Sequence, residues 1–108
     1  MSKRVVCIVA LAIIAGLSTT AAAGDLDGEA IARKVGCLGC HSVDTRIIGK
    51  AYRDVAAKYR GRPFAEEAIR WKVRHGTGNN RPVPMPAFDE KALSDVELGR
   101  VARWILGL

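Results

Sequence analysis

The chain has 108 residues, of which 49% are hydrophobic and 26% are charged, and its formal net charge is +6. A chain of this length is expected to form one compact domain at most. The Lys and Arg residues are spread along the chain and form no dense basic block, so nucleic-acid binding is not expected.

The N-terminus has the three-part layout of a secretory signal peptide. Lys3 and Arg4 supply the positive charge, Val5–Leu17 is an uncharged apolar run of 13 residues, and Ala21–Ala23 offers small residues for cleavage. A membrane-spanning helix needs about 20 apolar residues, so this run is short for an anchor. We therefore expect a signal peptide over 1–23, and a single exported, periplasmic domain over 24–108 with no stable membrane insertion.

The first helix of that domain is expected from Asp27 or Gly28 to Val35. Asp27 is a suitable N-cap, and Ile31 and Val35 are four residues apart on one face. Gly36 ends the helix and leads the chain directly into a cysteine motif.

Cys37, Cys40 and His41 form a Cys-x-x-Cys-His string, the attachment signature of a c-type haem. The two thiols would bind one haem covalently, and His41 would bind its iron axially. A redox dithiol or half of a zinc site uses the same Cys spacing. No strand pattern precedes Cys37 and no second Cys pair follows the signal peptide, so one covalent haem with its iron is the favoured prediction.

Two further helices are expected after the motif. Over Ala51–Tyr59 an apolar stripe repeats at helical spacing. Over Phe64–His75 two stripes lie side by side, one with Phe64, Ala68 and Trp71 and the other with Ala65, Ile69 and Val73. Gly76 and Gly78 stop the second of these helices.

A loop over Thr77–Phe88 contains three prolines and cannot be helical. Met85 lies between two of these prolines, which stiffen the loop, and it is the one methionine besides the initiator. A thioether is a usual sixth ligand for a His-bound haem iron, so Met85 is the predicted distal ligand. The alternative candidate is His75, whose place at a helix end favours capping of backbone carbonyls instead.

The last helix begins after Ser94, which forms a capping box with Glu97, and continues to the C-terminus. With no alternating segment that predicts a sheet, the fold class is all-α, with about four short helices around one haem.

Together these residues resemble a class I cytochrome c of the short bacterial periplasmic type. The resemblance implies a helical fold whose first and last helices cross near the haem edge, with Cys37 and Cys40 as thioethers, His41 as proximal ligand and Met85 as distal ligand. It covers nearly all of 24–108 and rests on Gly36–Ser42, Ile48–Gly49, Ala51–Tyr59, Pro82–Pro86 and Leu98–Leu106.

The chain departs from that family at two places. Lys50 stands where the family commonly has proline, whose carbonyl accepts the hydrogen of the proximal histidine ring; the Lys50 carbonyl can still accept it, but the fixed φ is lost. The polar stretch that contains Asn79, Asn80 and Arg81 stands where relatives often have an aromatic residue. The two asparagines are candidates to hydrogen-bond the Met sulfur or a neighbouring loop carbonyl, and Arg81 is a candidate partner for a propionate. The alternative interpretation is an ordinary polar turn.

Trp71 and Trp104 are candidates either for the haem pocket or for the helix core, and the core is favoured for Trp104.

The predicted function is electron transport: one-electron transfer by a His/Met-ligated haem in a respiratory chain, without enzymatic bond-making. The expected partners are a donor reductase and a terminal acceptor, met by a monomer. A mildly basic face would favour docking to an acidic redox partner or to an anionic membrane surface, and the alternative interpretation is a generally solvated basic surface. Two alternatives remain: a haem protein with an open or labile sixth site, peroxidase-like or gas-binding, and a dithiol or metal-binding protein without haem.

Overall fold

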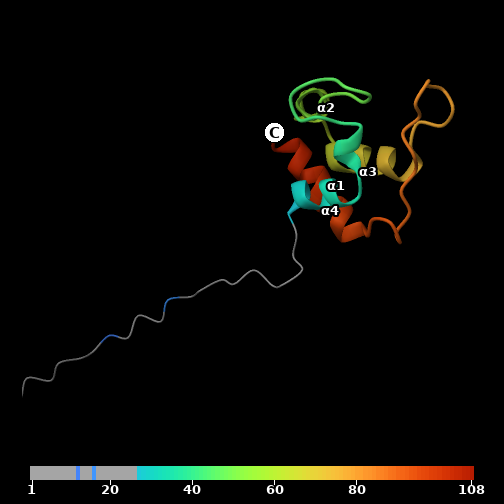
Figure 1. Cartoon of the computed structure of the whole chain (residues 1–108). Helices are drawn as coiled ribbons and strands as arrows, with labels where there is room; N and C mark the ends of the chain where they lie inside the picture. Colours follow the sequence, from blue (N-terminus) through green and yellow to red (C-terminus); the bar gives the residue numbers. More distant parts are fainter. Residues whose placement is uncertain (1–11, 13–15, 17–26) are drawn as a thin grey trace, which may run out of the picture.

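The structure is a computed structural model that describes Ala12, Gly16 and residues 27–108. The predicted signal peptide over 1–23 and its cleavage site lie outside the described residues, apart from those two positions. The described chain is helical and contains no strand (Figure 1). Its elements are α1 (Gly28–Lys34), a 3₁₀ turn η1 (Cys37–Gly39), α2 (Tyr52–Tyr59), α3 (Ala65–His75) and α4 (Asp95–Leu106).

The first and last helices cross in close contact. The Asp27 side chain caps α1 by accepting a hydrogen bond from the backbone N–H of Ala30 at 2.8 Å. At Gly28 a Cβ atom would lie 2.9 Å from the backbone carbon of Arg100 and would also press on Trp104. Glycine at this position therefore lets α1 approach α4 backbone to backbone, and the predicted crossing of these helices is present.

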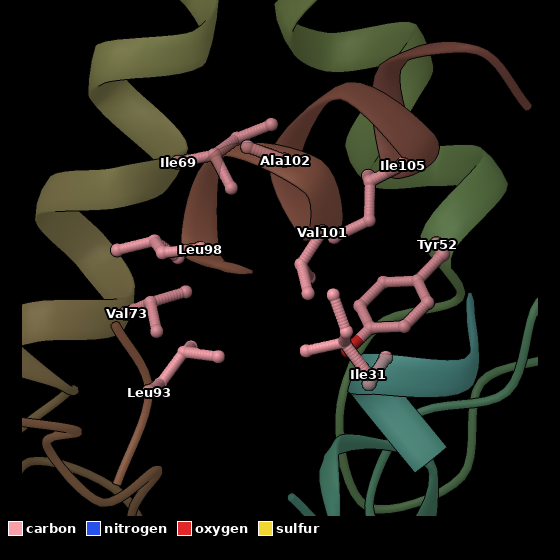
Figure 2. Packing of buried hydrophobic residues seen from close by; sticks show 10 residues of the cluster. Ile31, Tyr52, Ile69, Val73, Leu93, Leu98, Val101, Ala102 and Ile105 are labelled. Carbon is pink, nitrogen blue, oxygen red and sulfur yellow. The ribbon is translucent and has the colours of Figure 1, made fainter. Parts of the chain in front are cut away.

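A buried apolar cluster joins the four helices. In Figure 2 Ile69 and Val73 extend from α3 and Val101 from α4, while Ile31 and Tyr52 lie on the opposite side. Leu93, which is fully buried, closes the cluster just before α4. The second predicted stripe of α3, with Ile69 and Val73, is thus the core-facing one, whereas Phe64 and Trp71 of the first stripe are 78% and 59% exposed.

Arginine side chains fasten α3 to the segment that leads into α4. Arg74 is largely buried and donates to the backbone carbonyls of Phe88 at 3.1 Å and Leu93 at 2.7 Å, and to the Asp95 carboxylate at 2.7 Å. Because three acceptors on one segment share one guanidinium, Arg74 fixes the chain that returns from the proline-rich loop to α4.

The helix boundaries agree with the sequence predictions to within one residue, except that α4 ends at Leu106, two residues before the C-terminus. Its start is fixed by the predicted capping box, in which Ser94 and Glu97 exchange hydrogen bonds at 3.2 Å. The 3₁₀ turn over Cys37–Gly39 was not predicted. Within the part of the chain that the structure describes, no helix is long and apolar enough to cross a membrane.

Candidate functional site

A mainly apolar cavity of about 280 Å³ opens between α2, α3 and the proline-rich loop. All four residues predicted to hold a haem line it: Cys37, Cys40, His41 and Met85. Its volume lies near the lower end of the range for ligand pockets, roughly 300–1,000 Å³. The fold therefore brings together side chains that are up to 48 positions apart in the sequence.

The two cysteines are placed by the turn that follows α1. Gly36 has a left-handed backbone with a φ of 92°, which redirects the chain into η1. Both thiols are free and half-buried. Burial raises the pKa of Cys37 above its ordinary value, and a hydrogen bond with Tyr52 opposes this in part. Cys37 and Cys40 are thus two separate thiols that line the cavity, and they do not form a disulfide.

Three neighbours restrict the orientation of the His41 ring. Its Nδ1 lies 2.7 Å from the Lys50 carbonyl oxygen, and because a carbonyl only accepts, Nδ1 carries a hydrogen and Nε2 is the ring nitrogen left to act as a ligand. The Tyr52 ring stacks on the imidazole with 4.8 Å between centroids and 11° between planes. At Gly49 a Cβ atom would lie 2.7 and 2.8 Å from the two ring nitrogens, so only glycine fits there.

The hydrogen bond predicted to survive at Lys50 is thus present. It gives His41 the arrangement of a metal-binding histidine, in which one ring nitrogen donates to a backbone carbonyl and the other is available as a ligand.

Met85 is fixed by its neighbours on the N-terminal side of the loop. Its backbone N–H donates to Thr77 Oγ1 at 2.8 Å, and its carbonyl accepts from the Thr77 N–H at 3.1 Å. A Cβ atom on Gly76 would lie 2.9 Å from the backbone carbon of Pro86, so the loop passes directly over that glycine. These contacts hold the half-buried Met85 side chain on the cavity wall.

The C-terminal side of the loop is fixed to the same helix. The Phe88 N–H donates to the Val73 carbonyl at 3.0 Å, and the Phe88 carbonyl accepts from Arg74. Met85 thus lies between the Thr77 contacts, two residues after the end of α3, and the Phe88 contacts to α3 itself, so both ends of the loop are held near the C-terminal end of this helix.

The mouth of the cavity carries cations and apolar side chains. Five basic residues line the cavity and no carboxylate side chain of the described chain does so; they are Arg46, Lys50, Lys58, Lys72 and Arg81. Ile48 and Val83 are both about half exposed at this rim, at 54% and 55%. The rim thus suits an apolar group that bears negative charge at its edge.

Several other candidate residues lie outside the cavity. His75 is exposed and its Nδ1 donates to the Trp71 carbonyl at 2.8 Å, which is the predicted capping role. Trp71 is exposed on α3, and Trp104 is half-buried with its ring edge against Tyr52 at 5.5 Å between centroids. The pocket role considered for the two tryptophans is therefore not present, and Trp104 belongs to the helix core as favoured.

Asn79 and Asn80 are exposed, and the residue that hydrogen-bonds the Met85 backbone is Thr77 instead.

The sequence prediction missed the supporting residues Gly49, Tyr52 and Thr77. In the sequence, Tyr52 belongs to an apolar stripe and to the family-like residues of Ala51–Tyr59, but no role at His41 was predicted for it. Its position eleven residues after His41 gives no sign of ring stacking. Thr77 stands between two glycines immediately before the loop, where its hydroxyl is free to turn back on the chain, and that position was the one available signal.

The residues present fit a covalent haem. Two free thiols on one wall match two thioether bonds, the cavity lining is mainly apolar, and a histidine with a free Nε2 and a methionine thioether both reach the cavity. Within residues 27–108 no three His, Cys, Asp or Glu side chains cluster as a metal site, so the described chain offers no four-ligand zinc centre.

Comparison with known proteins agrees with this arrangement. The family described as "Cytochrome C oxidase, cbb3-type, subunit III" matches residues 23–105. Cytochrome c-551 of Pseudomonas aeruginosa is 40% identical over 81 residues, covering 74% of this chain and 75% of the relative. Cytochrome c-551 of Allochromatium vinosum is 43% identical over 90 residues, covering 82% and 94%. The solved structure of wild-type Nitrosomonas europaea cytochrome c552 has a TM-score of 0.64 at 34% identity, covering 74% and 98%.

Proposed function

The chain belongs to the cytochrome c family, as a small class I member that transfers electrons with a covalently attached haem c, and from this we propose which of its residues hold that haem. Cys37 and Cys40 form the two thioether bonds, His41 Nε2 is the proximal iron ligand and the Met85 sulfur is the distal ligand. The observation that supports this assignment best is that all four side chains line one apolar cavity.

The bound haem supplies a one-electron couple between ferric and ferrous iron, and a thioether ligand raises its potential relative to two imidazoles. The chain keeps the two ligands still during that change. The Lys50 carbonyl and the Tyr52 ring hold His41, and Thr77 holds the Met85 backbone. Ligands with locked orientations move little when the iron charge changes, which favours rapid electron exchange.

With both axial positions filled, no substrate can bind the iron, so we propose a carrier without enzymatic activity. The alternative of an open or labile sixth site requires Met85 to leave the cavity wall easily. The hydrogen bonds of Thr77 and Phe88 on either side of Met85 argue against such lability.

We place the carrier in the periplasm, on the strength of the N-terminal pattern of Lys3, Arg4 and the apolar run before Ala23. Its partners are redox proteins that dock at the cavity mouth, where the cations steer acidic surfaces toward it. The contacts are expected to be small and short-lived, as is typical of redox encounters.

Two measurements test the assignment. Denaturing electrophoresis with haem staining should show covalent haem in the wild type and none in the Cys37→Ala/Cys40→Ala variant, whereas staining of that variant would contradict thioether attachment. The ferrous wild type should not bind carbon monoxide at neutral pH, whereas Met85→Ala should bind it readily. Equal binding by the two proteins would favour the open-site alternative.

A further inference from the structure

The exposed side of α3 carries aromatic side chains that the haem site does not use. We name Phe64, Trp71 and His75 the aromatic edge. Trp71 is 59% exposed and stacks on His75 with 4.2 Å between ring centroids and 17° between planes. Phe64 precedes the helix and is 78% exposed. Phe64 and Trp71 are thus two large, exposed aromatic side chains at and on the same helix, which is unusual for a surface that faces only water.

The aromatic edge lies away from the cavity mouth. Trp71 is two residues from both Ile69 and Val73, which places it roughly 160° around the helix from each. Ile69 and Val73 are buried and line the cavity, and Trp71 does not. A redox partner seated at the mouth would therefore leave this edge free, so a second binding event could use it at the same time.

The backbone conformation of Phe64 also indicates that the aromatic edge is a binding surface. Its φ of 59° makes it the one residue other than glycine with a left-handed backbone in the described chain. That conformation costs a bulky residue free energy, and asparagine or glycine would adopt it more readily. The left-handed conformation therefore destabilises the folded chain, and the exposed Phe64 ring gains little core packing to offset it.

The net positive charge of the domain is concentrated in the segment of the sequence that contains the aromatic edge. Residues 58–76 contain six Lys and Arg against two Glu, whereas the rest of 27–108 contains nine Lys and Arg against eight Asp and Glu. Arg70 and Arg74 of this segment are paired with carboxylates. Arg60 and Arg62 are exposed and form no carboxylate ion pair within the described chain, and the Arg60 Nε donates to the backbone carbonyl of Leu106 at 3.1 Å.

We propose that the aromatic edge, with Arg60 and Arg62 in the segment that leads into it, docks this carrier on an anionic membrane surface. Aromatic rings with long cationic side chains suit a lipid interface, where the rings enter the headgroup region and the cations meet lipid phosphates. The edge is a protruding helix face rather than a hollow, and a lipid surface needs no matching shape. Docked in this way, the protein would move along the membrane with its haem mouth open to partners.

The test is cosedimentation of the haem-loaded protein with vesicles, read from haem absorbance in the pellet. The protein used is one whose intact mass shows that residues 1–23 have been removed, because the apolar run would itself bind lipid. We expect binding to vesicles that contain phosphatidylglycerol, little binding to pure phosphatidylcholine, and loss of binding at high salt.

The variant Phe64→Asn/Trp71→Gln should lower the partition coefficient at least roughly tenfold, since two aromatic side chains no longer leave water. Arg60→Gln/Arg62→Gln provides a second variant in which the aromatic rings remain. It should lower binding to anionic vesicles several-fold. The matched control is Val96→Gln, because Val96 is 64% exposed on α4 and lies outside the edge. An unchanged haem spectrum in each variant verifies the fold.

Three results would overturn the proposal. The first is absence of binding to anionic vesicles at low salt. The second is a loss of binding in the aromatic variant that does not exceed the loss in Val96→Gln. The third is a wild-type dimer in the absence of lipid that the aromatic variant abolishes, which would assign the edge to a second copy of the chain. None of these results bears on the ligands of the iron, so the haem assignment is tested separately.

Discussion

Replacement of Thr77 by valine probes how firmly the loop holds Met85. Valine has nearly the shape of threonine but lacks the hydroxyl that accepts the Met85 N–H at 2.8 Å. In the variant this half-buried N–H has no acceptor while the sulfur is on the iron. When Met85 leaves the iron, the loop opens and water satisfies the same N–H. The substitution should therefore destabilise the Met-bound state selectively.

The size of the effect follows from the cost of an unsatisfied buried donor, about 1–3 kcal/mol. If that cost falls entirely on the Met-bound state, displacement of Met85 becomes more favourable by roughly 5–150-fold. The assay is titration of the ferric protein with imidazole, which competes with the Met85 sulfur, and the readout is the loss of the red sulfur-to-iron absorption band. The apparent affinity for imidazole should rise by a factor in this range.

Thr77→Ser is the matched control, because serine keeps the hydroxyl oxygen and should bind imidazole as the wild type does. If the valine and serine variants both match the wild type within twofold, the Thr77 hydroxyl does not hold Met85 and the reasoning fails.

Substitutions at four further residues test the contacts that hold the site and the chain around it. Gly49→Ala should lower the yield of haem-loaded protein several-fold, because its Cβ would displace the His41 ring; an unchanged yield on a haem-stained gel would contradict the contact at 2.7 Å. Because Lys50 lacks the fixed φ of proline, we expect the proximal side to be looser than in the family, and Lys50→Pro should narrow the range of His41 orientations. Paramagnetic NMR of the ferric variant should then differ from that of the wild type, whereas identical spectra would refute the looser proximal side. Arg74→Met should lower the free energy of unfolding by about 2–4 kcal/mol in urea, with part of it regained in Arg74→Lys, since three acceptors lose a charged donor. The hydrogen bond from Arg74 holds the pKa of Asp95 below its usual value of 3.8, so this carboxylate adds stability above that pH and loses it as the pH falls further. Asp95→Asn should therefore flatten the acid side of the stability profile, and an unchanged profile would argue against the pair.

The helices could be predicted from the sequence because their signals are local. Ser94 and Glu97 mark the start of α4 by hydrogen bonds within one turn, and Asp27 does the same for α1. In contrast, α3 presents two apolar stripes of similar length, and helical spacing alone does not say which is buried. Ile69 and Val73 became the core-facing pair because α4 packs against them, which is a tertiary effect.

The ligand candidates could be predicted for a different reason. Cys37, Cys40 and His41 lie within five residues of one another and form a recognisable motif. Met85 could be identified because the chain contains so few other sulfur or imidazole ligands. The residues that orient them could not be predicted. The stacking of Tyr52 on His41 depends on how α2 is positioned, and sequence spacing does not record that position.

The Thr77 contact depends on closure of the loop that carries Met85, eight residues further along the chain.

We propose that His41 and Met85 occupy both axial positions of the haem iron and that the haem transfers one electron at a time. An optical redox titration of the exported protein tests it most directly, because the spectrum reports the axial ligands while the curve reports the potential. We predict a one-electron curve at the high potential typical of thioether ligation, with the red sulfur-to-iron band present in the ferric form and lost in Met85→His. A low potential without that band in the wild type would contradict the account.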